Sequence, residues 1–198
     1  MEPRVHSNEQ NSWRRERNER PHLSNIAIIL PVFSRFSHIL FTFYFAGHIH
    51  ALFNCSKYTF HENSTMGRDW EESRWLCQKS SEGDLVSIEE ENEQTFVESI
   101  IKNLTAVKYF IGLKKEQLAG KWKWLANGKP VDVSQGSHPW APGEPSGGSD
   151  KKCAAIYGNY RRYLGRFDDM PCFRRIKDAG YICERAVSCT HHEKGRSL

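Results

Sequence analysis

The sequence predicts an α+β domain, on three observations. Two amphipathic helical segments come early in the domain, several short strand-like segments follow them, and cysteines occur in both regions. Helices and strands that are segregated along a chain favour an arrangement in which helices pack against a mainly antiparallel sheet. At 198 residues, the chain has room for one such domain and an extension.

Each element of the domain has a local signal. Residues 58–60 alternate as in a half-buried first strand. Asp69 is a suitable N-cap for a short helix in which Trp70, Ser73 and Cys77 recur at helical spacing. Residues 83–88 are predicted to form a brief strand after a Gly turn. A second helix is predicted over about residues 90–102, with acidic residues near its start, where they suit the helix dipole.

The second half of the domain is strand-like apart from one long loop. Residues 109–113 form a buried run, and residues 121–124 alternate charge with indole, as a strand with one wet face requires. A Pro- and Gly-rich loop is predicted over about residues 126–152. The strands predicted after it are residues 153–157, 160–167 and 180–184.

The chain outside the domain divides into three segments. Residues 1–22 are charged and are predicted to be a disordered leader. Residues 23–52 are predicted to be a hydrophobic signal peptide or signal anchor, with possible membrane anchoring through residues 25–47. Arg35 disfavours a full membrane span, and the second apolar run has the length of a cleavable signal. A cleaved signal, an uncleaved anchor and a core element of the domain are the three alternatives that stay open. The domain then covers residues 53–186, and residues 187–198 form a flexible tail.

Cysteines and sequons predict an extracellular protein, either secreted or anchored as a type II membrane protein. Six Cys in this chain point to an oxidising compartment. Asn54, Asn63 and Asn103 each begin an Asn-x-Ser/Thr sequon and are candidate glycosylation sites. The net charge of +4 comes largely from the two tails and gives no support for binding nucleic acid.

The order and spacing of the most specific residues resembles a C-type lectin-like domain over residues 53–185. Phe110, Ser73 and Phe167 stand where that family usually has Trp, Ala and Trp. The positions that carry the likeness are Trp70 seven residues before Cys77, Gly83-x-Leu85-x-x-Ile88, Glu91 with Phe96, Phe110-Ile111-Gly112-Leu113, Trp140-x-Pro142-Gly143-Glu144-Pro145, Cys153, Phe167-Asp168-Asp169-x-x-Cys172 and Tyr181-Ile182-Cys183-Glu184.

The resemblance implies two disulfides, Cys77 with Cys183 and Cys153 with Cys172. Spacing alone does not choose among the fifteen pairings that six cysteines allow. Cys55 and Cys189 flank the domain, whose two ends lie together in the family fold. They are predicted to bridge each other, and pairing with a partner chain is the alternative.

The resemblance also implies a Ca²⁺ site on the long loop, because sugar-binding members hold a calcium ion that coordinates sugar hydroxyls. Calcium needs six to eight oxygen ligands. Glu-Pro-Ser at 144–146 and Phe-Asp-Asp at 167–169 match the family's two ligand motifs in part, and a cis bond is expected before Pro145. The predicted metal ligands are Glu144, Ser146, Asp150, Asp168 and Asp169, and all of these except Asp150 are predicted to contact carbohydrate.

Two departures weaken this site. Ser146 replaces an Asn and offers a shorter hydroxyl in place of an amide. Lys151 falls where the family has an acidic ligand, and an ammonium group repels a cation. Asp150 is one residue away, and the neighbouring Gly147 and Gly148 allow a backbone adjustment that would restore a carboxylate.

Two functions remain open. The first is a carbohydrate-binding C-type lectin that depends on calcium and recognises glycans or glycoproteins; the alternative is a calcium-independent lectin-like module that binds a protein ligand. An enzyme is not expected, because glycoside hydrolysis needs two opposed carboxylates, and adjacent Asp168 and Asp169 on a strand would face opposite ways.

Trp140 and Tyr160 are candidates for stacking on a sugar, and core packing is the alternative.

Two further residue patterns bear on possible binding sites. The nine histidines show no metal-ligand spacing beyond His191-His192 in the tail. Basic and aromatic residues interleave late in the domain and form either a wet sheet face or a contact surface for an anionic glycan or a protein. These residues are Tyr160, Arg161, Arg162, Tyr163, Arg166, Phe173, Arg174 and Arg175.

Overall fold

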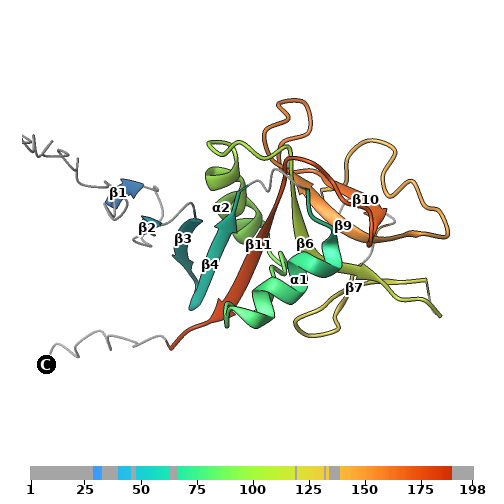
Figure 1. The fold of residues 1–198 in the computed structure, drawn as a ribbon, viewed down its shortest axis with the longest axis horizontal. Coiled ribbons are helices and arrows are strands. Elements are labelled where there is room, and N and C mark those ends of the chain that lie inside the picture. Colours follow the sequence, from blue (N-terminus) through green and yellow to red (C-terminus); the bar gives the residue numbers. More distant parts are fainter. Residues whose placement is uncertain are drawn as a thin grey trace, which may run out of the picture.

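The computed structural model describes residues 29–32, 40–45, 48–62, 67–118, 120–131, 133 and 139–188. Within these residues the domain is α+β, with helices α1 and α2 packed on one large sheet (Figure 1). The elements are β1 Ile29–Val32, β2 Leu40–Phe45, β3 His48–Phe53, β4 Ser56–His61, α1 Trp70–Lys79, β5 Asp84–Leu85, α2 Glu91–Ile101, β6 Lys108–Lys115, β7 Trp122–Trp124, β8 Pro130–Val131, β9 Lys151–Tyr157, β10 Phe167–Pro171 and β11 Ala179–Ala186.

Strand β11 lies at the centre of the sheet, although it is the last strand in the chain. It pairs with β4 in antiparallel register and with β6 in parallel register. Strand β6 also pairs with β9, and β10 forms the outer partner of β9. The last strand therefore joins the N-terminal part of the domain to the strands that carry the long loop.

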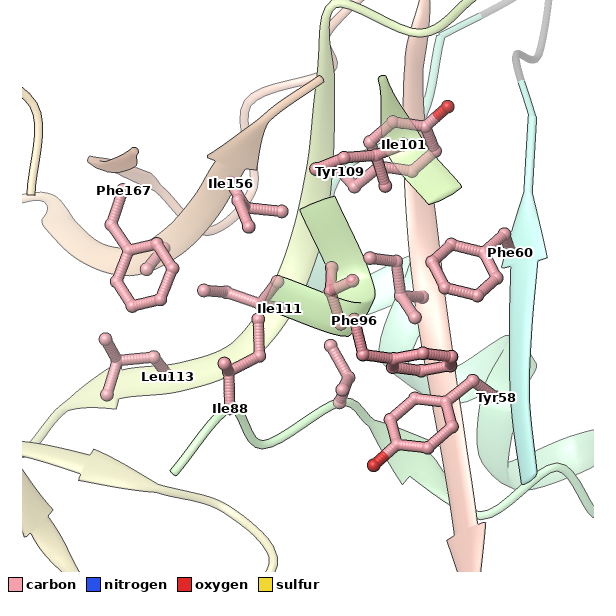
Figure 2. Close-up of a cluster of buried hydrophobic side chains, with 14 of the residues drawn as sticks. Tyr58, Phe60, Ile88, Phe96, Ile101, Tyr109, Ile111, Leu113, Ile156 and Phe167 are labelled. Atoms are coloured by element: carbon pink, nitrogen blue, oxygen red, sulfur yellow. The ribbon is translucent and has the colours of Figure 1, made fainter. Parts of the chain in front are cut away.

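The sheet has a hydrophobic core on each face, because successive side chains of a strand point in opposite directions. Tyr109 and Ile111 of β6 pack into the core that includes Phe96 of α2, whereas Phe110 packs into the core that includes Trp70 of α1. Figure 2 shows the first of these cores, with Phe96 among side chains of β4, β6 and β9. The helices thus stabilise opposite faces of the same strands.

Helix α1 begins as the sequence predicts. The Asp69 side chain accepts a hydrogen bond of 2.8 Å from the Glu72 amide, which satisfies one of the free N–H groups of the first turn. Trp70 is fully buried, and its indole N–H donates to the Ile111 carbonyl at 2.8 Å. This bond ties the start of the helix to the middle of β6.

Both predicted disulfides of the domain are confirmed. Cys77 of α1 is bonded to Cys183 of β11, and Cys153 of β9 is bonded to Cys172, next to β10. Cys55 is disulfide-bonded as well. Its predicted partner, Cys189, lies outside the described residues, so that pairing stays a prediction.

The N-terminal boundary of the sheet differs from the prediction. Strand β3 pairs with β4 over its whole length, and Ala51 is 2% exposed in the first core. Residues 48–52, which we expected to close the hydrophobic leader, are therefore part of the sheet. An apolar leader and a half-buried strand have similar hydrophobic content, and six residues are too few to distinguish the two.

No helix in the described part of the chain is long and apolar enough to cross a membrane. The assignment of residues 23–47 as signal or anchor stays a prediction.

A second difference concerns residues 160–167, which we expected to form a strand. Residues 161–165 form turns, closed by hydrogen bonds such as that from the Tyr163 amide to the Tyr160 carbonyl at 2.9 Å, and β10 begins only at Phe167. The aromatic residues that suggested a strand instead contact one another, with the rings of Tyr157, Tyr160 and Tyr163 about 5.4 to 5.6 Å apart.

Trp70→Phe tests the connection between α1 and β6. The substitution leaves a cavity and a buried carbonyl without its indole donor, so we expect the free energy of unfolding to fall by about 3 kcal/mol. Trp75→Phe is the matched control on the same helix, because Trp75 is 52% exposed, and we expect a change within about 0.5 kcal/mol. Urea unfolding followed by circular dichroism measures both, and equal losses would contradict the assigned role of Trp70.

Candidate functional site

Three carboxylates meet where the long loop crosses β10. Glu144, Asp168 and Asp169 each place an oxygen within 4.8 Å of the others. The loop is held there by backbone hydrogen bonds, from the Phe167 amide to the Pro139 carbonyl at 2.7 Å and from the Ala141 amide to the Phe167 carbonyl at 2.9 Å. The expected cis peptide bond between Glu144 and Pro145 is present.

Asp169 is the buried centre of this cluster, with a side chain that is 0% exposed. Its carboxylate accepts hydrogen bonds from the Ser146 hydroxyl at 2.8 Å, the Ser146 amide at 3.2 Å and the Gly147 amide at 2.8 Å. A buried carboxylate is tolerated only when its oxygens have partners. The loop therefore folds around Asp169 through its own backbone.

Two lysines supply the positive charge in this cluster. Lys151 Nζ lies 3.3 Å from Asp169 Oδ1 and also donates to the Ser146 hydroxyl. Lys108, from β6, forms an ion pair with Asp168, and the exposed fractions of the two side chains are 20% and 10%. Lys108 Nζ also lies 4.6 Å from the ring centroid of Tyr157. Each aspartate thus has its own ammonium partner.

The pKa shifts agree with this pairing. Burial lowers the pKa of Lys108, but the hydrogen bond and charge of Asp168 outweigh burial, so the net shift is upward and the ammonium keeps its proton. Burial raises the pKa of Asp169, yet the hydrogen bonds that its carboxylate accepts outweigh burial and lower that pKa below its ordinary value. Burial, followed by a hydrogen bond to Asp169, raises the pKa of Glu144.

Most of the predicted site residues come together. Glu144, Asp168 and Asp169 form the cluster, and Ser146 donates into it. Among the described residues that offer a ligand atom, Asp150 is not part of this group, and it is exposed on the loop.

The two aspartates do not separate to opposite sides as expected for adjacent strand residues. Their carboxylate oxygens lie within 4.8 Å of one another. Adjacent Cα atoms are only about 3.8 Å apart, so two short side chains can still reach one edge of the strand.

The two aromatic candidates differ in their environment. Trp140 is partly buried and packs edge-on against Trp122 and Phe167 at the border of the first core, at centroid distances of 5.1 and 5.9 Å. Tyr160 is 44% exposed and lies among the other tyrosines of the turn. Tyr160 is therefore the more exposed of the two candidates.

A cleft of about 380 Å³ opens beside the aspartates and has a basic lining. Lys108, Lys151, Arg174, Arg175 and Lys177 line it together with Asp168 and Asp169. Sequence reasoning missed Lys108, which is sixty residues from Asp168 in the chain. The available signal was a lysine directly before the apolar run of residues 109–113.

A comparison with protein-family models finds the Lectin C-type domain over residues 67–185. The chain belongs to the C-type lectin domain family. Rat P-selectin is 30% identical over 128 residues, which are 64% of this chain and 16% of P-selectin. Human C-type lectin domain family 4 member K is 30% identical over 130 residues, which are 65% of this chain and 36% of that protein. This C-type lectin chain thus spans well under half the length of both relatives.

Solved structures of C-type lectin domains include both glycan-bound and calcium-independent examples. The cow CD23 carbohydrate-recognition domain, crystallised with a GlcNAc2Man3 oligosaccharide, is 28% identical with a TM-score of 0.54, over 69% of this chain and 92% of that one. The Ca²⁺-independent C-type lectin SPL-2 from Saxidomus purpuratus is 26% identical with a TM-score of 0.56, over 69% and 90% of the chains. The fold therefore does not decide whether calcium is used.

Asp169→Ala tests whether this carboxylate folds the loop. We expect amide hydrogen exchange over residues 143–150 to rise by at least tenfold, because the Gly147 amide and the Ser146 hydroxyl lose their acceptor, a cost of about 1.4 kcal/mol or more. Asp150→Ala removes an equal charge from the same loop and is the control that leaves exchange unchanged. Similar exchange in the two variants would show that the loop is held by other contacts.

Proposed function

We propose that this C-type lectin domain binds acidic glycans without calcium, and that Lys108 and Lys151 take the place of the metal ion beside Asp168 and Asp169. The observation that carries this proposal is the pair of lysine–aspartate ion pairs in the ligand cluster. They neutralise the carboxylates that a calcium ion would otherwise bind, and they keep the long loop in place.

The donor set fits calcium poorly. Both oxygens of Asp169 accept hydrogen bonds from loop amides. One oxygen of Asp168 accepts from the Lys108 ammonium, and one oxygen of Glu144 accepts from the Ser146 amide. Few oxygens therefore remain for an ion that needs six to eight. A doubly charged ion about 4 Å from the Lys108 ammonium would be repelled by about 8 kcal/mol at an effective dielectric constant of about 20.

The cleft beside these ion pairs favours an anionic ligand. Lysines form ion pairs with Asp168 and Asp169, and Arg175 forms one with Glu72 at 3.0 Å. The charged groups that remain on the wall of the cleft are positive. Among the described residues, neither Arg174 nor Lys177 forms an ion pair. Arginine and lysine bind sulfate and carboxylate groups through charge-assisted hydrogen bonds. Phe173, which is 77% exposed beside Arg174, offers an apolar surface for a sugar ring.

Calcium-dependent glycan binding is the second candidate function. It is favoured by the three carboxylates that gather within 4.8 Å. In that case the ion would displace the ammonium groups of Lys108 and Lys151, with Glu144, Ser146, Asp168 and Asp169 as ligands. Asp150 would join them only after the loop has shifted.

An extracellular location accompanies either function. The disulfides of the domain agree with an oxidising compartment. Asn54 and Asn103 are exposed and accessible for glycosylation, whereas Asn63 lies outside the described residues. We propose that the protein is secreted or held at the cell surface as a type II membrane protein.

Binding to a glycan array in EDTA tests the proposed function. We expect sulfated or carboxylated glycans to bind in EDTA, and Arg174→Gln/Lys177→Gln to weaken that binding by at least tenfold, because two charge-assisted hydrogen bonds of about 1.5 kcal/mol or more are lost. Lys102→Gln/Lys121→Gln removes the same charge from exposed positions outside the cleft and should leave binding unchanged.

Three results would contradict the proposal. Equal binding by the two double variants would place the ligand elsewhere. Binding that appears only with added calcium would support the second candidate function. An array without any bound glycan would favour a protein ligand.

A further inference from the structure

A second basic surface lies on the turn that follows β9. Arg161 and Arg162 are exposed there, next to the exposed Tyr160 and the half-buried Tyr163. Within the part of the chain that the structure describes, neither arginine forms an ion pair. The Arg162 guanidinium lies 5.3 Å from the ring centroid of Tyr163. The proposed function gives these two charges no role.

The turn and the basic cleft lie at the same end of the sheet, on either side of β6. Strand β6 pairs with β9 on one side and with β11 on the other. Val107, directly before β6, accepts a hydrogen bond from the Gly158 amide at 2.9 Å and donates its own amide to the Asp178 carbonyl at 3.2 Å. Neighbouring strands are about 4.8 Å apart, so the backbones of Gly158 and Asp178 are about 10 Å apart. Residues 160–163 and 174–177 therefore flank the start of one strand.

Side chains connect the cleft to the turn. Lys108 lines the cleft, and its Nζ lies 4.6 Å from the ring centroid of Tyr157. The Tyr157 ring lies 5.6 Å from the ring of Tyr160 and 5.6 Å from that of Tyr163, on which Arg162 packs. Cationic groups bind sulfate, and aromatic rings offer apolar faces to sugar rings. The surface thus alternates the two kinds of contact that a sulfated sugar chain needs.

Hydrogen bonds hold the turn in shape without a ligand. The Tyr157 amide donates to the Arg166 carbonyl at 2.9 Å, and the Gly165 amide donates to the Tyr157 carbonyl at 2.9 Å. Gly158 lies so close to β6 that a Cβ atom added to it would be 2.6 Å from the Ala106 carbonyl oxygen. A surface that is ordered beforehand loses less conformational entropy when it binds.

We propose that the cleft and this turn bind one linear sulfated polysaccharide, with one anionic group at Arg174 and Lys177 and another at Arg161 and Arg162. The inference rests on the proposed function and adds to it a second subsite and a minimum ligand length. A short anionic glycan reaches one subsite only. A longer chain reaches both, and its second contact is intramolecular, so the affinity rises with chain length.

Two neighbouring groups limit the extent of this surface. Asp178 is exposed beside Lys177 and opposes an anion there. Arg166 is not part of the surface, because it lines a different cleft together with Glu90 and Glu98. The second subsite is therefore confined to the two arginines at the tip of the turn.

Heparin fragments of defined length test the inference by calorimetry on the full chain in EDTA. We expect a heparin octasaccharide to bind at least tenfold more tightly than a heparin disaccharide. Arg161→Gln/Arg162→Gln should weaken octasaccharide binding by at least tenfold and leave disaccharide binding unchanged, because only the longer fragment reaches the turn. Lys102→Gln/Lys121→Gln removes the same charge from exposed positions elsewhere and should change neither affinity. Circular dichroism of each variant confirms that it is folded.

The failure of this inference differs from the failure of the proposed function. If both fragments bind with equal affinity, or if the turn variant keeps full affinity for the octasaccharide, the cleft alone is the site and only the inference is overturned. If neither fragment binds in EDTA, the proposed function is contradicted together with the inference. A single-stranded DNA of the same charge that binds as tightly as the octasaccharide would overturn the inference too, since the surface would then attract any polyanion.

Discussion

The site depends on one constraint, which is that the carboxylate of Asp169 is fully buried and must have a partner for each oxygen. Loop amides at 146 and 147, the Ser146 hydroxyl and the Lys151 ammonium supply these partners. A loop rich in Pro and Gly has no periodic pattern to fold it, so this set of hydrogen bonds defines its shape. In the proposed function the loop keeps that shape without a metal ion.

The rest of the fold places Asp169 where the loop can reach it. The Cys153–Cys172 disulfide joins the two ends of the β9–β10 hairpin, and β9 pairs with β6, which carries Lys108. The Cys77–Cys183 disulfide and the Trp70 indole connect α1 to the central strands. Two cores on opposite faces then fix those strands, and Figure 2 shows the first of them. The positions of the two lysine–aspartate pairs thus follow from packing across the whole domain.

Sequence reasoning recovered the elements whose signals are local or whose motifs are specific. It found both helices and the central strands, because caps and periodicity lie within short windows. The resemblance to the family supplied the two disulfides and four residues of the carboxylate cluster. Sequence reasoning missed the Lys108–Asp168 pair, since strand pairing brings those two residues together over a long separation in the chain. It also assigned residues 48–52 to an apolar leader, because a short strand next to an apolar segment has no distinct period.

Calcium calorimetry on the unmodified chain tests the central claim most directly. If Lys108 and Lys151 replace the metal ion, calcium at about 5 mM, well above the Kd of sensor and extracellular sites, produces no saturable heat. Lys108→Gln/Lys151→Asp is the positive control, in which we expect calcium binding to appear because both ammonium groups are gone and a carboxylate is added. Saturable calcium binding by the unmodified chain in this range contradicts the account.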